Sequence, residues 1–168
     1  MRRGEMKATE KRCILKKTIE LKELDELVAV FYRNSLEKRK NSVLLLEGNL
    51  GAGKTTFCSS LGKALRVRET VQSPTFNLLN IYHGEDIQFY HYDLYRIRHP
   101  EEVRELGFSD YWSQDSERQI HAVEWWERAP DSFVGVKNLF LIKLTYDLDD
   151  ETDSRNIEIY EWKNENET

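Results

Sequence analysis

Cysteine and proline are scarce in this chain, which has two cysteines and three prolines among 168 residues. The cysteines, Cys13 and Cys58, stand far apart and form no C-x-x-C pair, so the sequence shows no metal-binding spacing of that type. Nothing in this cysteine usage implies an oxidising compartment. Cys58 falls in a segment with helical character, and we expect it to pack as a small apolar residue.

Long apolar runs and an excess of positive charge are missing as well. No segment is apolar over the length needed to cross a bilayer, and the polar N-terminus lacks the apolar stretch of a secretory signal. The formal net charge of −5 argues against a basic nucleic-acid-binding face over the whole molecule. We therefore expect a cytoplasmic protein with no membrane partner.

The residues that are present suit one compact globular domain, since 39% are hydrophobic and 33% are charged. Periodicity predicts strands and helices that alternate along the first half of the chain and mostly strands thereafter. We expect strands at 13–21, 43–46, within 71–82, and at 87–93, 120–125, 139–146 and 157–162, with helices at 21–40, around 57–65 and from Pro100. This order predicts an α/β fold with a central parallel sheet and added antiparallel strands.

Residues 48–55 read Gly-Asn-Leu-Gly-Ala-Gly-Lys-Thr and match the phosphate-binding P-loop pattern G-x-x-x-x-G-K-[ST] in full. Glycines let the backbone approach a phosphate, consecutive N–H groups form an anion-binding nest, and the following helix adds its positive N-terminus. We therefore expect ATP and Mg²⁺ as ligands. Lys54 would contact the β- and γ-phosphates, and Thr55 would place its hydroxyl on Mg²⁺.

This loop also fixes the expected fold class, a three-layer fold of the P-loop NTPase type. We expect residues 1–12 to form a flexible basic extension, 13–163 a single P-loop ATPase domain and 164–168 an acidic tail. The loop residues expected to bind the nucleotide are Asn49, Leu50, Gly51, Ala52, Gly53, Lys54, Thr55 and Thr56.

Two acids at predicted strand ends are candidates for the remaining chemistry, because hydrolysis needs a carboxylate near Mg²⁺ and a group that orients the attacking water. Asp93 ends the run 87–93, and open α/β sheets bind ligands at the carboxyl ends of their strands. We expect Asp93 to hold Mg²⁺, directly or through water, and Glu124 to position or deprotonate water. Either acid taken alone could instead cap a helix or pair with an arginine.

Other polar residues receive plainer interpretations. The spacing of Ser73-Pro74-Thr75 favours an ordinary turn. His91 and His121 are interpreted as core histidines without a role. The many tyrosines and tryptophans are expected to be mostly core.

Four blocks of the sequence resemble those of the TsaE family. They are Leu46–Phe57 around the P-loop, Ser73-Pro74-Thr75-Phe76, His91-Tyr92-Asp93-Leu94-Tyr95-Arg96 and Glu124-Trp125-Trp126-Glu127-Arg128. The blocks come in the order and spacing of the family. The P-loop occurs in many proteins, whereas the other three blocks together with it are specific to this family.

The resemblance implies an ATPase that works with the TsaD and TsaB proteins, which form N6-threonylcarbamoyladenosine (t6A) at position 37 of tRNAs reading codons that begin with A. It implies that ATP hydrolysis resets the TsaD–TsaB complex between turnovers, so that tRNA is met only through that complex. The residues that it assigns to catalysis are Lys54, Asp93 and Glu124, those assigned to the metal are Thr55, Thr75, Asp93 and Glu124, and Trp125 is assigned to the nucleotide.

Three other functions remain open from the residues alone. A small-molecule kinase has a similar P-loop but needs a lid with paired arginines, and Arg96 and Arg98 are a close pair without a lid-length insertion. A GTPase switch recognises guanine with N-K-x-D, a tetrapeptide that this chain lacks. An ATP-binding scaffold with negligible turnover fits if a partner completes the site. Arg96 and Arg128 are candidates for charge stabilisation and, equally, for structural ion pairs.

Overall fold

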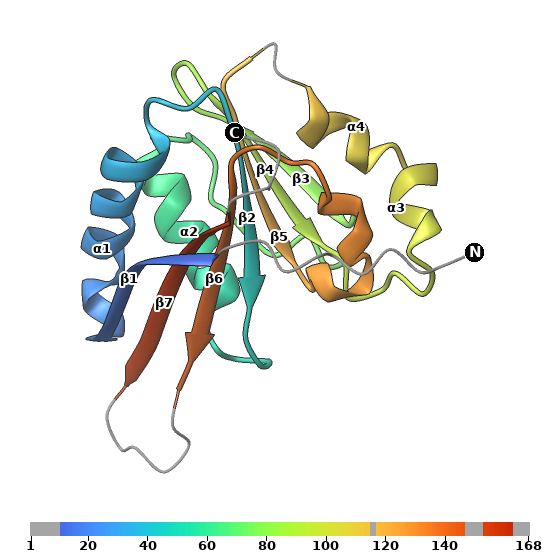
Figure 1. Cartoon of the computed structure of the whole chain (residues 1–168). Coiled ribbons are helices and arrows are strands. Elements are labelled where there is room, and N and C mark those ends of the chain that lie inside the picture. Colours follow the sequence, from blue (N-terminus) through green and yellow to red (C-terminus); the bar gives the residue numbers. More distant parts are fainter. Residues whose placement is uncertain (1–10, 115–116, 147–152, 163–168) are drawn as a thin grey trace.

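The computed structural model describes residues 11–114, 117–146 and 153–162, and within them seven strands form one sheet in the order β1-β7-β6-β2-β5-β4-β3 (Figure 1). The strand bounds are β1 Lys11–Glu20, β2 Asn41–Glu47, β3 Leu79–His83, β4 Gln88–Asp93, β5 Gln119–Glu124, β6 Leu139–Thr145 and β7 Ser154–Trp162. Most of the expected basic extension (1–12) and all of the expected acidic tail (164–168) lie outside the described residues. The domain bounds therefore stay a prediction.

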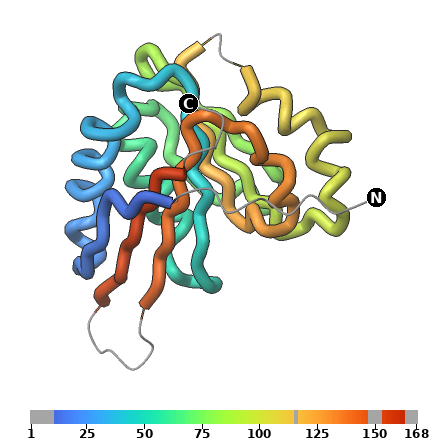
Figure 2. Tube along the Cα trace, in the orientation of Figure 1, coloured from blue at the N-terminus to red at the C-terminus, as the bar shows by residue number. Residues whose placement is uncertain are grey.

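The centre of the sheet is parallel, as the sequence predicts. β2 pairs in parallel with both β5 and β6, and β4 pairs in parallel with β5. At the edges, β3 joins β4, β7 joins β6 and β1 joins β7, all antiparallel. β1 and β7 are therefore direct neighbours although they come from opposite ends of the sequence (Figure 2).

Helices cover both faces of the sheet and complete a three-layer α/β fold of the expected class (Figure 1). One layer holds α1 (Leu24–Phe31) and α2 (Lys54–Ala64), with η1 (Leu21–Glu23) and the π-helix η2 (Tyr32–Leu36) flanking α1, and the other holds α3 (Glu101–Glu105), α4 (Phe108–Ser113), η3 (Trp126–Arg128) and η4 (Pro130–Phe133). In β2, Leu44 and Leu46 pack in the first layer, whereas Val43 and Leu45 pack in the second. Because successive side chains of a strand point to opposite faces, a continuous apolar run fits a strand covered on both sides.

The helix predicted over 21–40 differs from the observed one, because its last part is a π-helix over Tyr32–Leu36. The N–H of Glu37 donates to the carbonyl of Tyr32, five residues earlier, at 2.9 Å. The wider turn carries Leu36 into the core, where it is 1% exposed. A search for the 3.6-residue period cannot detect a change to the wider π-helical turn. The predicted α-helix is therefore longer than the observed one, which ends at Phe31.

The sequence patterns also do not predict α4. This helix begins after Gly107, at φ 72°, and its two buried side chains, Phe108 and Trp112, are one turn apart. An isolated apolar pair carries little periodic signal. No helix within the described part of the chain has both the length and the apolar character of a membrane span.

Candidate functional site

The glycine-rich loop joins the end of β2 to the start of α2. Gly51 and Gly53 have φ angles of 81° and 102°, a left-handed region that glycine enters without steric cost. Gly48 meets a different constraint, since a Cβ at that position would lie 2.5 Å from the carbonyl oxygen of Leu144 on β6. The loop can therefore pack against the end of β6 only with glycine at position 48.

The side chain of Lys54 folds back onto this loop. Its Nζ atom donates to the carbonyl oxygens of Gly48 at 2.6 Å and Asn49 at 3.2 Å, and the residue is 6% exposed. The same atom lies 4.7 Å from the centre of the Trp125 ring, a cation–π distance. The ammonium group is thus held beside the N-terminus of an 11-residue helix, whose free N–H groups add positive potential.

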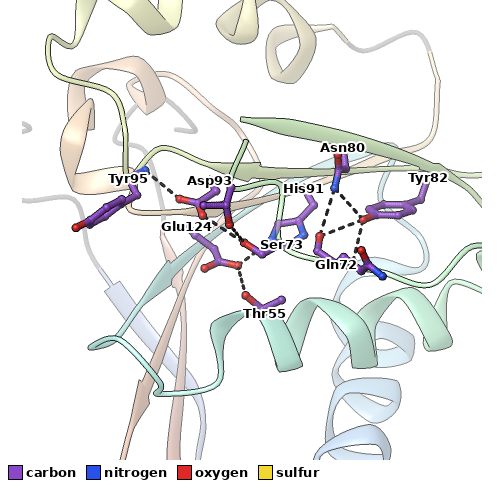
Figure 3. A network of polar contacts seen from close by, with 10 residues as sticks. Thr55, Gln72, Ser73, Asn80, Tyr82, His91, Asp93, Tyr95 and Glu124 are labelled. Carbon is purple, nitrogen blue, oxygen red and sulfur yellow. Dashed lines mark hydrogen bonds and ion pairs between the residues drawn. The ribbon is translucent and has the colours of Figure 1, made fainter. Parts of the chain in front are cut away.

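Asp93 and Glu124 stand side by side at the carboxyl ends of neighbouring strands. They are register partners in the parallel pair β4–β5 and are 6% and 4% exposed. Asp93 accepts hydrogen bonds from the backbone N–H of Tyr95 at 3.0 Å and from the hydroxyl of Ser73 at 3.3 Å. Glu124 Oε1 accepts the hydroxyl of Thr55 at 3.0 Å (Figure 3). Two strands and one helix thus bring both candidate acids and the candidate metal-binding threonine together.

The segment Ser73–Thr75 is bonded to Asp93 and is more than an isolated turn. Ser73 Oγ lies 2.9 Å from Thr75 Oγ1. The same Ser73 hydroxyl donates to Asp93 (Figure 3). The bond to Asp93 spans 20 residues of sequence, so the local turn pattern cannot reveal it. The plain-turn interpretation therefore misses this contact.

His91 is buried as expected, and it also contacts one of the candidate acids, which its interpretation as a core histidine without a role does not include. It is 0% exposed, and its Nε2 atom lies 2.8 Å from Glu124 Oε1, the atom that also accepts the Thr55 hydroxyl. A carboxylate oxygen can only accept, so Nε2 carries the hydrogen of this bond. His91 Nδ1 is buried and has no hydrogen-bond partner among the described residues. The imidazole therefore bonds Glu124 through Nε2, whereas its Nδ1 atom is buried without a partner among the described residues.

His121 matches the expectation of a satisfied core histidine. It lies in β5, on the other side of the sheet from the P-loop helix, between the rings of Tyr90 and Tyr92 at 4.6 and 5.9 Å. The hydroxyl of Tyr92 donates to Nδ1, and Nε2 donates to Gln119 Oε1, both at 3.2 Å. Burial lowers the pKa of His121 to about 3, so the ring is neutral.

A cavity of about 430 Å³ opens between the loop, the strand ends and the segment Ser73–Thr75. Its lining residues are Leu50, Gly51, Gly53, Lys54, Thr55, Thr56, Ser73, Thr75, Asp93, Tyr95, Glu124 and Trp125. Of the predicted site residues, only Asn49 and Ala52 lie elsewhere, in an adjoining hollow of about 360 Å³. Sequence reasoning does not single out Tyr95 from the aromatic residues expected to be mostly core. It is 54% exposed and lies beside Trp125, with ring centres 5.1 Å apart.

The chemistry of this lining fits Mg²⁺ and a polyphosphate. The hydroxyls of Thr55 and Thr75 and the carboxylates of Asp93 and Glu124 are hard oxygen donors, the kind that Mg²⁺ takes. The glycine backbone and the ammonium group beside it suit phosphate oxygens. Among the described residues that line the cavity, Lys54 is the one cation.

Comparisons with known proteins agree on one family. The family model described as threonylcarbamoyl adenosine biosynthesis protein TsaE matches residues 20–162. The chain is 50% identical over 90 residues to the tRNA threonylcarbamoyladenosine biosynthesis protein TsaE of Nostoc sp., covering 53% of this chain and 55% of that protein. It is 35% identical over 124 residues to the protein of the same name from Haemophilus influenzae, covering 74% and 73%. The chain thus spans little more than half the length of the Nostoc relative.

A solved structure also matches the fold. The crystal structure of Bacillus subtilis YdiB superposes with a TM-score of 0.68 at 24% identity, over 92% of this chain and 89% of that one. At this identity the likeness shows the fold alone. The family match extends from the end of β1 through β7 and includes the P-loop, the segment Ser73–Thr75 and both strand-end acids. The chain belongs to the TsaE family, the threonylcarbamoyl adenosine biosynthesis proteins of tRNA modification.

Proposed function

We propose that this chain is a Mg²⁺-dependent ATPase that acts with the TsaD and TsaB proteins to form t6A at position 37 of tRNAs reading codons that begin with A. ATP hydrolysis resets the TsaD–TsaB complex between turnovers, and tRNA is met through that complex. One observation carries the ATPase part: Asp93 and Glu124 are register partners at adjacent strand ends, and Glu124 is bonded to Thr55 of the P-loop. Family membership supports the partners and the tRNA product. The missing N-K-x-D tetrapeptide favours ATP over GTP.

The polar groups of the cavity divide into phosphate-binding and metal-binding groups in this proposal. Lys54 and the N–H groups of the loop hold the phosphates. Thr55, Thr75, Asp93 and Glu124 supply the oxygens for Mg²⁺, which when bound neutralises charge on the phosphates. The buried position of both acids strengthens their interaction with a cation, because little water screens them.

Glu124 is the residue that orients the attacking water and accepts its proton. Its Oε1 atom is fixed by two donors from different elements, Thr55 on α2 and His91 on β4. A carboxylate already held in its reactive orientation does not have to reorient during the reaction, so that free-energy cost is absent from the barrier. His91 is therefore a positioning residue that acts through Glu124.

The charge of the cavity explains why turnover should depend on a partner. Phosphoryl transfer spreads negative charge over the γ-phosphoryl oxygens, and a second cation commonly stabilises it. Lys54 is the one cation among the described lining residues. Arg96 lies over the ring of Phe76 at 4.9 Å, and Arg128 lies over the ring of Tyr95, a lining residue, at 5.8 Å. Neither arginine is itself among the described residues that line the cavity. We expect the missing cation to come from the TsaD–TsaB pair.

The test is Mg²⁺-ATP hydrolysis by the purified chain, alone and with TsaD, TsaB and tRNA. Slow hydrolysis that rises with the partners, together with repeated rounds of t6A formation, is the expected result. If the rate of hydrolysis does not change with the partners, and t6A formation does not depend on the chain, the tRNA role is contradicted. The proposal that the chain is an ATPase would still stand.

Variants of the two acids test their separate tasks. Glu124→Gln should bind ATP and lose hydrolysis by about 10²- to 10⁴-fold, the usual contribution of a general base. Asp93→Asn should raise the Mg²⁺ concentration needed for half-maximal activity. Glu101→Gln, an exposed acid on α3, is the matched control and should behave like the parent chain. Normal turnover of Glu124→Gln would show that Glu124 is not the general base.

A further inference from the structure

Three buried side chains from three elements converge next to the cavity. Cys58 lies on α2, His91 on β4 and Glu124 on β5, and one ligand atom of each lies within 4.8 Å of the other two. Cys58 and His91 are 0% exposed, and Glu124 is 4% exposed. A sulfur, an imidazole nitrogen and a carboxylate oxygen therefore meet inside the protein, in a set that the proposed hydrolysis does not use as a unit.

Regular repeats bring the three groups together. Cys58 follows Thr55 by three residues on α2, so both lie on the helix face that packs against the sheet. His91 and Asp93 are two residues apart on β4 and share one face of that strand. His91 Nε2 and Glu124 Oε1 are already in contact at 2.8 Å. The rigid centre of the fold, rather than a loop, holds the cluster.

The donor set suits zinc and not magnesium. Thiolate and imidazole are ligands that Zn²⁺ takes, whereas Mg²⁺ prefers oxygen. Three protein ligands leave a fourth position for water, the composition of an open zinc site. Glu124 lines the cavity, which gives an ion a route from solvent. His91 Nδ1, buried without a partner among the described residues, leaves the ring a second nitrogen besides the one bonded to Glu124.

The thiol of Cys58 changes state when a metal binds. Cys58 is a free cysteine buried in the core, so an entering metal would meet an S–H group. A zinc ion takes the sulfur as thiolate, and the proton leaves to solvent. One metal–sulfur bond forms and one S–H bond breaks.

We propose that Cys58, His91 and Glu124 form a zinc-binding site. Zinc bound there engages the Oε1 atom that Thr55 and His91 now share, and so withdraws Glu124 from water and from Mg²⁺. Zinc is then an inhibitor of hydrolysis. The binding stands on the cluster alone, whereas the inhibition rests on the proposed ATPase function.

Cobalt(II) is the probe for the site, because a cobalt–thiolate bond gives a sulfur-to-metal charge-transfer absorption in the near ultraviolet. The chain has two cysteines, and the exposed Cys13 supplies a matched control for the buried Cys58. The full chain and Cys13→Ser should show the absorption and lose it when zinc is added, and Cys58→Ser should show none. No absorption in the full chain, or an absorption that disappears with Cys13→Ser, overturns the site.

A second variant and a second measurement guard against misfolding. Cys58→Ala and Cys58→Ser are checked by thermal unfolding, and the zinc dissociation constant of each is measured by competition with a chelating dye. We expect it to rise at least about tenfold in both, and unchanged affinity in a folded variant overturns the proposal. Zinc should inhibit Mg²⁺-ATP hydrolysis by the full chain and not by Cys58→Ala. If the absorption forms in a chain that never hydrolyses ATP, the zinc site stands and the ATPase proposal fails.

Discussion

His121 should make the folded protein sensitive to acid. The residue is 0% exposed, and burial lowers its pKa from 6.5 to about 3. Both ring nitrogens are used in the neutral form, because Nδ1 accepts from the hydroxyl of Tyr92 and Nε2 donates to Gln119. Protonation of Nδ1 in the folded protein would place its N–H against the hydroxyl hydrogen of Tyr92 at a buried site, so this hydrogen bond would be lost.

The magnitude follows from proton linkage. Below its ordinary pKa of 6.5, His121 binds a proton in the unfolded chain, whereas in the folded chain it binds one only near pH 3. The stability that the neutral ring gives is therefore complete above pH 6.5 and is lost as the pH falls toward 3. Each pH unit within this window lowers the free energy of unfolding by about 1.4 kcal/mol. By about pH 4 the loss is roughly 3 kcal/mol, a large part of an ordinary domain's stability.

Urea unfolding of the parent chain and of His121→Gln isolates this contribution, because the other acids titrate in both proteins. Near neutral pH the variant should be less stable by about 1–2 kcal/mol, the value of two buried hydrogen bonds. Near pH 4 the order should reverse, since glutamine has no proton to bind. A stability difference that stays constant between the two conditions would refute the buried neutral histidine.

Three further predictions concern the site. Lys54→Ala should weaken Mg²⁺-ATP binding by about 10- to 100-fold, the value of a charged hydrogen bond, and titration with a fluorescent ATP analogue measures it; undiminished affinity would exclude the P-loop as the phosphate site. Gly48→Ala should lower the free energy of unfolding by about 1–3 kcal/mol. Its new Cβ meets the carbonyl oxygen of Leu144 at 2.5 Å, and an unchanged melting temperature would show that the loop is free to move away. His91→Phe should lower kcat about tenfold or more with little change in KM, because Glu124 loses a hydrogen bond to its charged oxygen. His91→Gln keeps an N–H donor and should recover part of that loss, and equal losses in the two variants would argue against positioning.

The site residues could be predicted from the sequence where they are consecutive in the chain or stand at the end of a periodic segment. The P-loop spans 48–55 without interruption, and the buried run before it predicts β2. Asp93 and Glu124 could be placed because the carboxyl end of a strand is visible in the pattern itself. Their predicted position at the ligand-binding edge of the sheet agrees with the observed register.

The remaining features depend on which strands become neighbours. His91 and Glu124 are 33 residues apart, and their contact exists because β4 lies beside β5. In the same way, the patterns predict β6 as a strand but do not show that it is a parallel neighbour of β2. Strand order depends on how whole layers pack together, and the periodicity of a single sequence carries no information about which strands become neighbours. The pattern of its own strand therefore identifies His91 as a core residue but cannot show its contact with Glu124.

The position of β7 between β1 and β6 has a consequence for how the chain folds as it is synthesised. Among the strands of the described sheet, β1 is made before the others, and its one neighbour there is β7, at residues 154–162. The parallel centre around β2, β4 and β5 can close before those residues leave the ribosome, whereas β1 must wait as an unpaired strand. Lysine and arginine at Lys11, Arg12, Lys16 and Lys17 discourage such a strand from pairing with other chains during that interval. The last step of folding should thus be the joining of the two ends of the chain, a slow long-range pairing.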